Sequence, residues 1–234
     1  LGLRKQAERE FNRLLSEPDL PPELYWLTAA VLRDSGAYHK AGQFVSHGGK
    51  GWRQRYPAGY DFSYWNIAYP IAYEDLVLQA SQESDIAPEL VWAVMREESG
   101  FDPQVESWAN AIGLMQLILP TARRVGKDLG MRINRRTLRQ PGVNITLGSA
   151  YLGHLKEKFK GHPVLMVAGY NAGEGAVQRW LRERPGADLD MFVEEIPYNQ
   201  TRGYTKRVIA TMATYLFLYG DERPMLELDL TLAR

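Results

Sequence analysis

The sequence contains no cysteine, has no net formal charge and carries no long apolar run. Without cysteine the chain forms no disulfide and has no thiolate nucleophile, although this does not fix its compartment. Its 28 basic residues balance 28 acidic ones, so the positive field of a nucleic-acid-binding protein is missing. No apolar run reaches the roughly 18 residues that a membrane helix needs. We therefore expect a soluble chain with no transmembrane segment and no nucleic-acid partner, and a carbohydrate substrate fits this composition better.

Histidine is also scarce, because the chain has only His39, His47, His154 and His162. They show neither the HExxH spacing nor a cysteine partner, so the sequence predicts no zinc site. The run at residues 173–175 (GEG) lacks the preceding strand and the third glycine of a phosphate-binding loop. We expect neither a metal nor a cofactor.

Helical periodicity dominates the chain, which predicts an all-α (mainly α) fold. Apolar residues at three- and four-residue steps, together with prolines at first-turn positions, indicate the helices. Glycines at 36, 42, 48, 49 and 51 indicate a connection, and only residues 226–232 alternate like a strand. The expected helices cover residues 4–15, 21–35, 88–99, 120–129, 144–159, 163–170, 175–183 and 201–219.

An aromatic-rich stretch occupies residues 52–73. Such side chains could stack against sugars, but aromatic residues more often pack in a core or between domains. We expect packing to be their main role. The stretch contains Trp52, Tyr56, Tyr60, Tyr64, Trp65, Tyr69 and Tyr73.

Five sequence blocks carry the most specific signal. The first runs from Met95 to Pro120, where an acidic pair ends an apolar helix and Gly-Leu-Met-Gln follows at 113–116. The others are NITLG at 144–148, YNAG at 170–173, FVEEIPY at 192–198 and TRGY at 201–204. In this order the blocks resemble the catalytic core of the lytic transglycosylases that cut bacterial peptidoglycan, above all the large soluble enzymes. The resemblance implies a lysozyme-like catalytic domain with a fold similar to that of goose-type lysozymes.

The resemblance also implies how the chain is divided. Residues 69–77 (YPIAYEDLV) resemble the segment that leads into the catalytic domain of the large soluble enzymes. Residues 1–74 are then a helical linker or the end of an α-superhelical region with an aromatic connection, and residues 75–234 are the catalytic domain. The chain begins at Leu1 without methionine, so we expect a processed or trimmed chain whose export signal is not visible. The family implies a location in the periplasm or cell envelope.

A glycosidase needs a carboxylic acid that stays protonated near neutral pH, because the leaving oxygen must receive a proton. Glu97 and Glu98 are the candidates, and periodicity does not choose between them because each lies over an apolar stripe. The resemblance places the catalytic acid at Glu98, since residues 98–103 (ESGFDP) match the family pattern. An apolar surrounding would raise the pKa of Glu98. The dipeptide alone favours two carboxylates that are simply solvated at a helix end, since carboxylates are mostly exposed; the downstream blocks reverse that preference.

The resemblance assigns substrate-binding roles to further residues and leaves alternatives for several. Ser99 would hydrogen-bond near the acid, Gly113 would let the backbone approach the substrate, and the Tyr170 hydroxyl would lie near Glu98. Asn171 would help to shape the turn. The residues expected to line the cleft are Met115, Gln116, Glu194 and Tyr215. Met115 and Tyr215 could instead be core residues, and Glu194 could be a solvated surface group. The Tyr-Asn-Ala-Gly block could simply end a helix that its glycine caps. The substrate-binding residues that the resemblance implies are Ser99, Gly113, Met115, Gln116, Tyr170, Asn171, Glu194 and Tyr215.

Three positions depart from the family pattern. The proline of the helix that follows the Gly-Leu-Met-Gln turn is displaced, with Leu119 where proline is usual and Pro120 next, which would shift the cleft wall slightly. Asn110 stands where glycine is usual, and asparagine is the best substitute if the backbone has a positive φ there. Gln200 stands where glutamate usually precedes Thr-Arg, which removes any charge contact made by that glutamate.

The function implied by the resemblance is cleavage of the β-1,4 bond between N-acetylmuramic acid and N-acetylglucosamine, with closure of a 1,6-anhydro ring. Glu98 would act as acid and then as base, and peptidoglycan glycan strands would be the partner. Two alternatives stay open: a hydrolytic goose-type muramidase, and a non-catalytic glycan-binding or scaffold module. A non-catalytic module would be expected to have lost the acid, whereas Glu98 is present. No protein partner is indicated.

Overall fold

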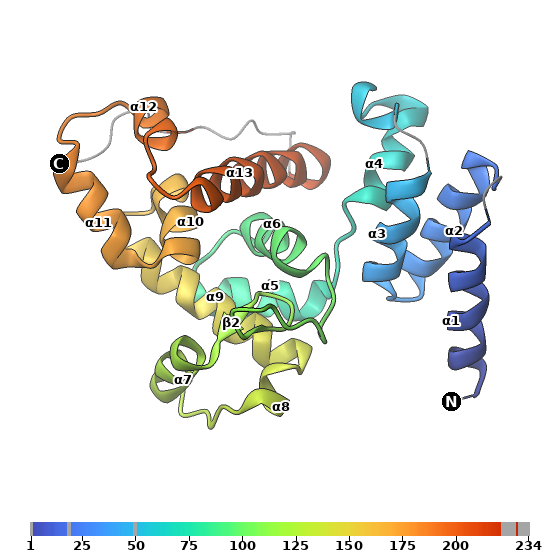
Figure 1. Cartoon of the computed structure of the whole chain (residues 1–234), viewed down its shortest axis with the longest axis horizontal. Helices are drawn as coiled ribbons and strands as arrows, with labels where there is room; N and C mark the ends of the chain where they lie inside the picture. Colours follow the sequence, from blue (N-terminus) through green and yellow to red (C-terminus); the bar gives the residue numbers. More distant parts are fainter. Residues whose placement is uncertain (1, 18–19, 49–50, 221–227, 229–234) are drawn as a thin grey trace. The chain divides into compact units, whose positions relative to one another are not determined.

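The computed structural model describes residues 2–17, 20–48, 51–220 and 228. Within these residues the regular structure is helical apart from one two-stranded sheet, which confirms the all-α class. The backbone contacts divide the chain into two compact units, Leu1–Ala72 and Tyr73–Arg234 (Figure 1). None of the helices in the described part of the chain is both long and apolar enough to cross a membrane.

The first unit is a small helical assembly in which α2 packs against α3. The α3 helix corrects the prediction of a connection in this region. The glycine at position 42 costs helix stability, but α3 buries Ala41, Phe44 and Val45, and that burial outweighs a weak local propensity. The elements are α1 (Gly2–Leu15), α2 (Pro22–Asp34), α3 (Tyr38–His47), η1 (Trp52–Gln54), η2 (Gly59–Asp61) and α4 (Phe62–Ala68).

The aromatic stretch packs largely within this unit. Trp52 lies edge-on to Trp26, with ring centroids 5.6 Å apart, and edge-on to Trp65 at 5.0 Å. Tyr64 packs on Trp26 at 4.6 Å. Packing is thus confirmed for the centre of the stretch, whereas Tyr60 is exposed.

The second unit contains the remaining helices and a short hairpin. Its main helical contacts join α6 to α13, α5 to α9, and α10 to both α9 and α13 (Figure 1). The antiparallel hairpin pairs Ala111 with Ile118 and Ile112 with Leu117. The elements are α5 (Glu74–Ser84), α6 (Pro88–Ser99), β1 (Ala111–Ile112), β2 (Leu117–Ile118), α7 (Leu119–Asp128), α8 (Arg135–Leu138), α9 (Pro141–Lys158), α10 (Pro163–Ala172), α11 (Glu174–Glu183), α12 (Leu189–Glu194) and α13 (Asn199–Tyr219).

The α6 helix forms the centre of the second unit. It starts with Pro88 in its first turn, where a missing amide hydrogen is harmless, and buries every residue from Leu90 to Met95. A helix buried on all sides is held by its neighbours instead of by a single amphipathic face. The predicted helix at 88–99 is confirmed, and its last turn carries both glutamates into the candidate site. The predicted strand at 226–232 lies outside the described residues, apart from residue 228.

Candidate active site

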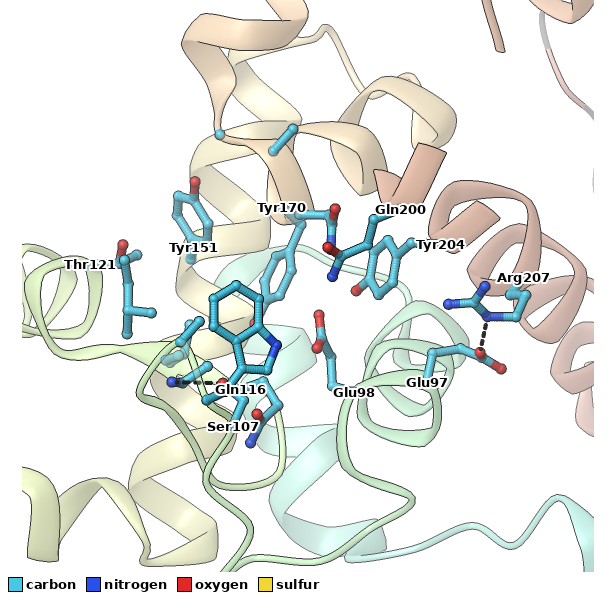
Figure 2. Close-up of a pocket in the computed structure, with 18 residues that line it drawn as sticks. Glu97, Glu98, Ser107, Gln116, Thr121, Tyr151, Tyr170, Gln200, Tyr204 and Arg207 are labelled. Atoms are coloured by element: carbon cyan, nitrogen blue, oxygen red, sulfur yellow. Dashed lines mark hydrogen bonds and ion pairs between the residues drawn. The ribbon is translucent and has the colours of Figure 1, made fainter. Parts of the chain in front are cut away.

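A pocket of about 550 Å³ opens in the second unit beside the C-terminal end of α6. One wall comes from the loop after α6 and the hairpin, and the other comes from α10 and α13 (Figure 2). The pocket therefore gathers three of the five sequence blocks from positions far apart in the chain. Its lining residues are Glu97, Glu98, Ser107, Trp108, Ala109, Ala111, Gln116, Leu117, Ile118, Thr121, Tyr151, Tyr170, Asn171, Ala172, Gly173, Gln200, Tyr204 and Arg207.

The two glutamates at the end of α6 point in different directions (Figure 2). Glu98 points into the pocket, toward Tyr170 and Tyr204. Glu97 points toward α13, where its Oε2 accepts a hydrogen bond from Nε of Arg207 at 3.0 Å and its Oε1 accepts one from Thr211 at 2.9 Å. Both oxygens of Glu97 are thus engaged, and Glu98 is the carboxyl group directed at the pocket.

Burial raises the pKa of Glu98 to about 7, because the surrounding side chains remove water from its carboxylate. The Tyr204 hydroxyl acts in the opposite direction, the charge of Glu97 raises the pKa further, and the Arg207 guanidinium lowers it. A carboxyl group with a pKa near 7 is protonated in about half of the molecules at neutral pH. Glu98 can therefore both give and take a proton under physiological conditions.

Two buried tyrosines flank Glu98. The Tyr170 hydroxyl donates to the backbone carbonyl of Met115 at 2.8 Å, which ties α10 to the Gly-Leu-Met-Gln turn. The Tyr204 hydroxyl is directed at Glu98 (Figure 2), although it meets no acceptor at normal hydrogen-bond geometry in the described part of the chain. Burial, and then the charge of Glu98, raise the pKa of both tyrosines well above its ordinary value. Both phenols therefore stay protonated beside the carboxyl group.

The Gly-Leu-Met-Gln turn is fixed by a buried asparagine from α9. The Asn144 amide nitrogen donates to the carbonyls of Ile112 and Leu138 at 2.9 and 2.8 Å, and its oxygen accepts from the Met115 amide at 2.7 Å. Gly113 has φ +80°, and a Cβ there would lie 2.5 Å from Nδ2 of Asn144. Gly113 is therefore needed for this turn and for its packing against α9, and it does not line the pocket.

Ser99 connects the end of α6 to the same turn. Its hydroxyl lies 2.7 Å from the Leu114 carbonyl and 3.0 Å from the Met95 carbonyl, and it accepts from the Phe101 amide at 3.1 Å. The residue thus lies next to Glu98 in the chain, but its contacts hold backbone segments together. Ser99 therefore supports the backbone around Glu98 and the turn.

The prediction that Met115 lines the cleft is wrong for its side chain. Met115 is fully buried and packs against α9, where a Cβ on Gly148 would lie 2.2 Å from its sulfur. Tyr215 is also a core residue, because it is fully buried and its ring stacks with Trp92 at a centroid distance of 5.8 Å. In both cases the core alternative is the correct one.

Glu194 is not part of the pocket either. It ends α12 with an exposed side chain that pairs with Lys206. The α13 helix instead brings Gln200 to the pocket wall (Figure 2). The exposed position of Glu194 agrees with the surface alternative.

Gln116 and Asn171 do line the pocket. The Gln116 amide nitrogen donates to the Gly113 carbonyl at 2.9 Å, so its side chain closes the turn that carries it. The Asn171 oxygen accepts from the Thr201 hydroxyl at 2.7 Å, which joins α10 to α13. Gly173 ends α10 with φ +84° and caps the helix as expected. Asn110 has φ +60°, the conformation for which asparagine substitutes best for glycine.

Several residues of the site did not emerge from sequence reasoning. Tyr204 and Arg207 lie on α13 beside the glutamates, Asn144 fixes the turn, and Trp108 lines the pocket with its side chain exposed to solvent. Tyr204 and Asn144 each belong to a recognised block, so the blocks signalled them without indicating a role. Among the described residues, no cluster of three or more His, Cys, Asp or Glu side chains has the arrangement of a metal site.

The comparisons with known proteins agree with this geometry. The family model of the transglycosylase SLT domain matches residues 75–192. The chain belongs to the SLT transglycosylase family. The match covers α5 to α11 and most of α12, and so includes both glutamates and the Tyr-Asn-Ala-Gly block.

The sequence is also similar to individual proteins of the SLT family. The chain is 35% identical over 161 residues to a soluble lytic murein transglycosylase of Salmonella typhimurium, covering 68% of this chain and 25% of that protein. It is 30% identical over 168 residues to the membrane-bound lytic murein transglycosylase C of Actinobacillus pleuropneumoniae, and the match covers 62% of this chain and 46% of that protein. The chain thus spans about a quarter of the length of the soluble relative.

A solved structure shows the same fold across both units. The 70-kDa soluble lytic transglycosylase of Escherichia coli superposes with a TM-score of 0.80 at 28% identity, covering 94% of this chain and 34% of that one. The expected lysozyme-like architecture of a soluble lytic transglycosylase is thereby confirmed for this SLT-family chain.

Proposed function

We propose that this SLT-family chain carries the catalytic domain of a peptidoglycan lytic transglycosylase, and that Glu98 is its acid and base. The observation that carries the proposal is the pair of glutamates at the end of α6. Glu97 is held by Arg207 and Thr211. Glu98 has a pKa of about 7 and points into the pocket, between two tyrosines. Relatives that bear the name lytic murein transglycosylase support the same reaction.

The reaction needs one working carboxyl group. Glu98 gives its proton to the O4 leaving oxygen of N-acetylglucosamine while the bond from that oxygen to C1 of N-acetylmuramic acid breaks. The acetamido group of the muramic residue stabilises the cation at C1. The Glu98 carboxylate then removes the proton from the 6-hydroxyl of the same residue as its oxygen attacks C1. The products are a free 4-hydroxyl and a 1,6-anhydro ring, and no water is consumed.

Glu97 does not fit the role of a second catalytic carboxylate. It is the only other carboxylate among the described residues that line the pocket. Its two oxygens are held by Arg207 and Thr211, so it is turned away from a sugar above Glu98. With only Glu98 directed at the glycosidic bond, the described part of the site lacks a second carboxylate to act as nucleophile. The 6-hydroxyl of the substrate can take that role intramolecularly.

The proposal extends to the setting of the enzyme. The substrate would be the glycan strand of peptidoglycan, which places the protein in the periplasm or cell envelope. Soluble and membrane-bound relatives named for murein support this location. Residues 1–74 would be the end of an α-superhelical region and residues 75–234 the catalytic domain, as the structural similarity over 94% of the chain supports.

The test is turnover of purified cell-wall sacculi by Glu98→Gln. The amide is nearly isosteric but cannot deliver a proton, so turnover should fall by about a hundredfold or more. Glu97→Gln is the matched control, because it makes the same chemical change one residue away and should retain most of the activity. A folded Glu98→Gln protein with activity similar to that of Glu97→Gln would contradict the assignment and favour a different acid.

A further inference from the structure

One side chain on the pocket wall has no role in the proposed proton chemistry. Trp108 lies in the loop between α6 and β1, lines the pocket, and is 92% exposed. It is the most exposed large apolar side chain in the described part of the chain. An exposed apolar residue needs no explanation by itself. Trp108 differs because it is large, lies in the pocket that contains Glu98, and is carried by a firmly held loop.

The loop closes on itself through backbone hydrogen bonds. The Ser107 amide donates to the Ala111 carbonyl at 2.9 Å, and the Asn110 amide donates to the Ser107 carbonyl at 2.9 Å. The Ser107 hydroxyl also accepts from the Ala111 amide at 3.1 Å. The turn around Trp108 is therefore set by its own backbone, and the indole is not needed to stabilise it.

The loop is also anchored to α8. The Glu106 carboxylate pairs with Arg135 and with Arg139, and Arg135 donates in addition to the Asn110 side-chain oxygen at 3.2 Å. Glu106 further forms an isolated bridge with Ile112 of the hairpin. These contacts hold the turn on both sides of Trp108. They fix the backbone at Trp108, so the indole is presented from a defined position beside the pocket.

We propose that Trp108 is a stacking platform for a pyranose ring of the glycan strand. The proposal rests on the proposed function, because the ring belongs to the strand whose bond Glu98 cleaves. The axial C–H groups of a β-linked pyranose form an apolar face, which a flat indole can cover while the sugar hydroxyls stay in water. Ile118, which is 42% exposed on the same wall, extends this apolar surface, and Ser107 and Gln116 place polar groups beside it.

A rigid exposed platform has a specific energetic consequence. Because the turn is ordered before the sugar arrives, binding does not require the loop to become ordered, and most of the gain from covering the indole appears as affinity. Trp108 carries no proton that the reaction needs. It should therefore contribute to binding the strand and not to the chemical step, so its loss raises KM and leaves kcat nearly unchanged.

The experiment uses the Glu98→Gln protein, which binds substrate without turning it over. Calorimetry measures its Kd for two probes: alternating N-acetylglucosamine–N-acetylmuramic acid strands freed of stem peptides, and the same strands with peptides. Adding Trp108→Ala should weaken binding of the peptide-free strands by about tenfold, whereas Trp108→Phe should restore most of the affinity. Tyr60→Ala is the matched control, because it removes an 85% exposed aromatic residue that does not line the pocket.

Each outcome decides the proposal. Equal affinities of the Trp108→Ala and parent proteins, with the parent binding normally, would overturn the platform and leave the proposed function standing. A loss seen only with peptide-bearing strands would also overturn it, because the indole would then contact the peptide. A parent protein that binds neither probe would contradict the proposed function and this inference together. Since Trp108 is almost fully exposed, unchanged thermal unfolding should accompany every variant.

Discussion

Glu98→Gln should stabilise the protein at alkaline pH while it removes activity. Folding raises the pKa of Glu98 from 4.5 to about 7 through burial, so the folded state disfavours the ionised carboxyl. At about 1.4 kcal/mol for each pKa unit, the shift corresponds to about 3 kcal/mol. The sign follows from linkage: the penalty is absent below 4.5, where both states are protonated, grows between 4.5 and about 7, and is complete above that range. Glutamine cannot ionise, so the Glu98→Gln protein does not incur this free-energy penalty.

The assay is urea unfolding of wild type and Glu98→Gln at about pH 4 and about pH 8.5, followed by circular dichroism. Substitution also changes packing, but that effect is nearly independent of pH, so the difference between the two pH values isolates the ionisation penalty. The variant should gain about 3 kcal/mol relative to wild type between the low and the high pH. Glu97→Gln is the control, because it makes the same chemical change at a carboxylate whose oxygens are held by Arg207 and Thr211. The same relative stability of Glu98→Gln at both pH values would refute the desolvated carboxyl.

Three further predictions follow from the same contacts. Glu97→Gln should move the alkaline limb of the pH–rate profile to lower pH and Arg207→Gln to higher pH, because these charges respectively raise and lower the pKa of Glu98. Gly113→Ala should cost about 3 kcal/mol or more, since φ is +80° and the new Cβ would lie 2.5 Å from an amide nitrogen, whereas Gly175→Ala has open space and should be nearly neutral. EDTA should leave activity on sacculi unchanged, because the proposed reaction needs only proton transfer.

Contrary results would be equally informative. Alkaline limbs that move in the same direction for Glu97→Gln and Arg207→Gln would show that Glu98 does not govern that limb. Equal melting temperatures of the Gly113→Ala and Gly175→Ala proteins would contradict the account of the turn. Activity that EDTA removes and a single divalent ion restores would require a metal site.

The sequence predicted the helices that carry strong local signals. The α6 helix combines a first-turn proline with a continuous apolar run, and both its ends were placed correctly. The α3 helix was missed because Gly42 interrupts its pattern, while the burial of Phe44 and its neighbours that stabilises it depends on α2. The β1–β2 hairpin was missed because two-residue strands are too short to show alternation. Local patterns could therefore predict an element only where local preference and tertiary packing agree.

The site was predicted less evenly than the fold. Resemblance placed Glu98, Gln116, Tyr170 and Asn171 together, and the pocket contains all four. The side-chain direction of Met115 could not be read from its block, because it depends on the space left by Gly148 on α9. The divergence of the two glutamates likewise depends on α13, which lies more than 100 residues further along the chain.

The same limit explains the residues that were missed. Asn144 belongs to a recognised block that does not indicate its role, because its three hydrogen bonds reach backbone groups that only the folded chain brings together. The sequence carries no pattern that indicates exposure of Trp108, because the turn that carries it is held by hydrogen bonds and ion pairs that form only in the folded chain. These roles arise from tertiary structure, so periodicity and motif spacing do not reveal them.

The most direct test of the account is the chemical end of the released muropeptides. In the proposed reaction Glu98 is acid and then base, and the muramic 6-hydroxyl is in place when the bond breaks, so we expect intramolecular attack to exceed attack by water. Mass spectrometry of products from purified sacculi should show 1,6-anhydromuramic acid ends that resist borohydride reduction and weigh one water less than the hydrolysis products. Reducing ends as the main product would contradict the transglycosylase reaction and identify a goose-type muramidase that uses the same acid.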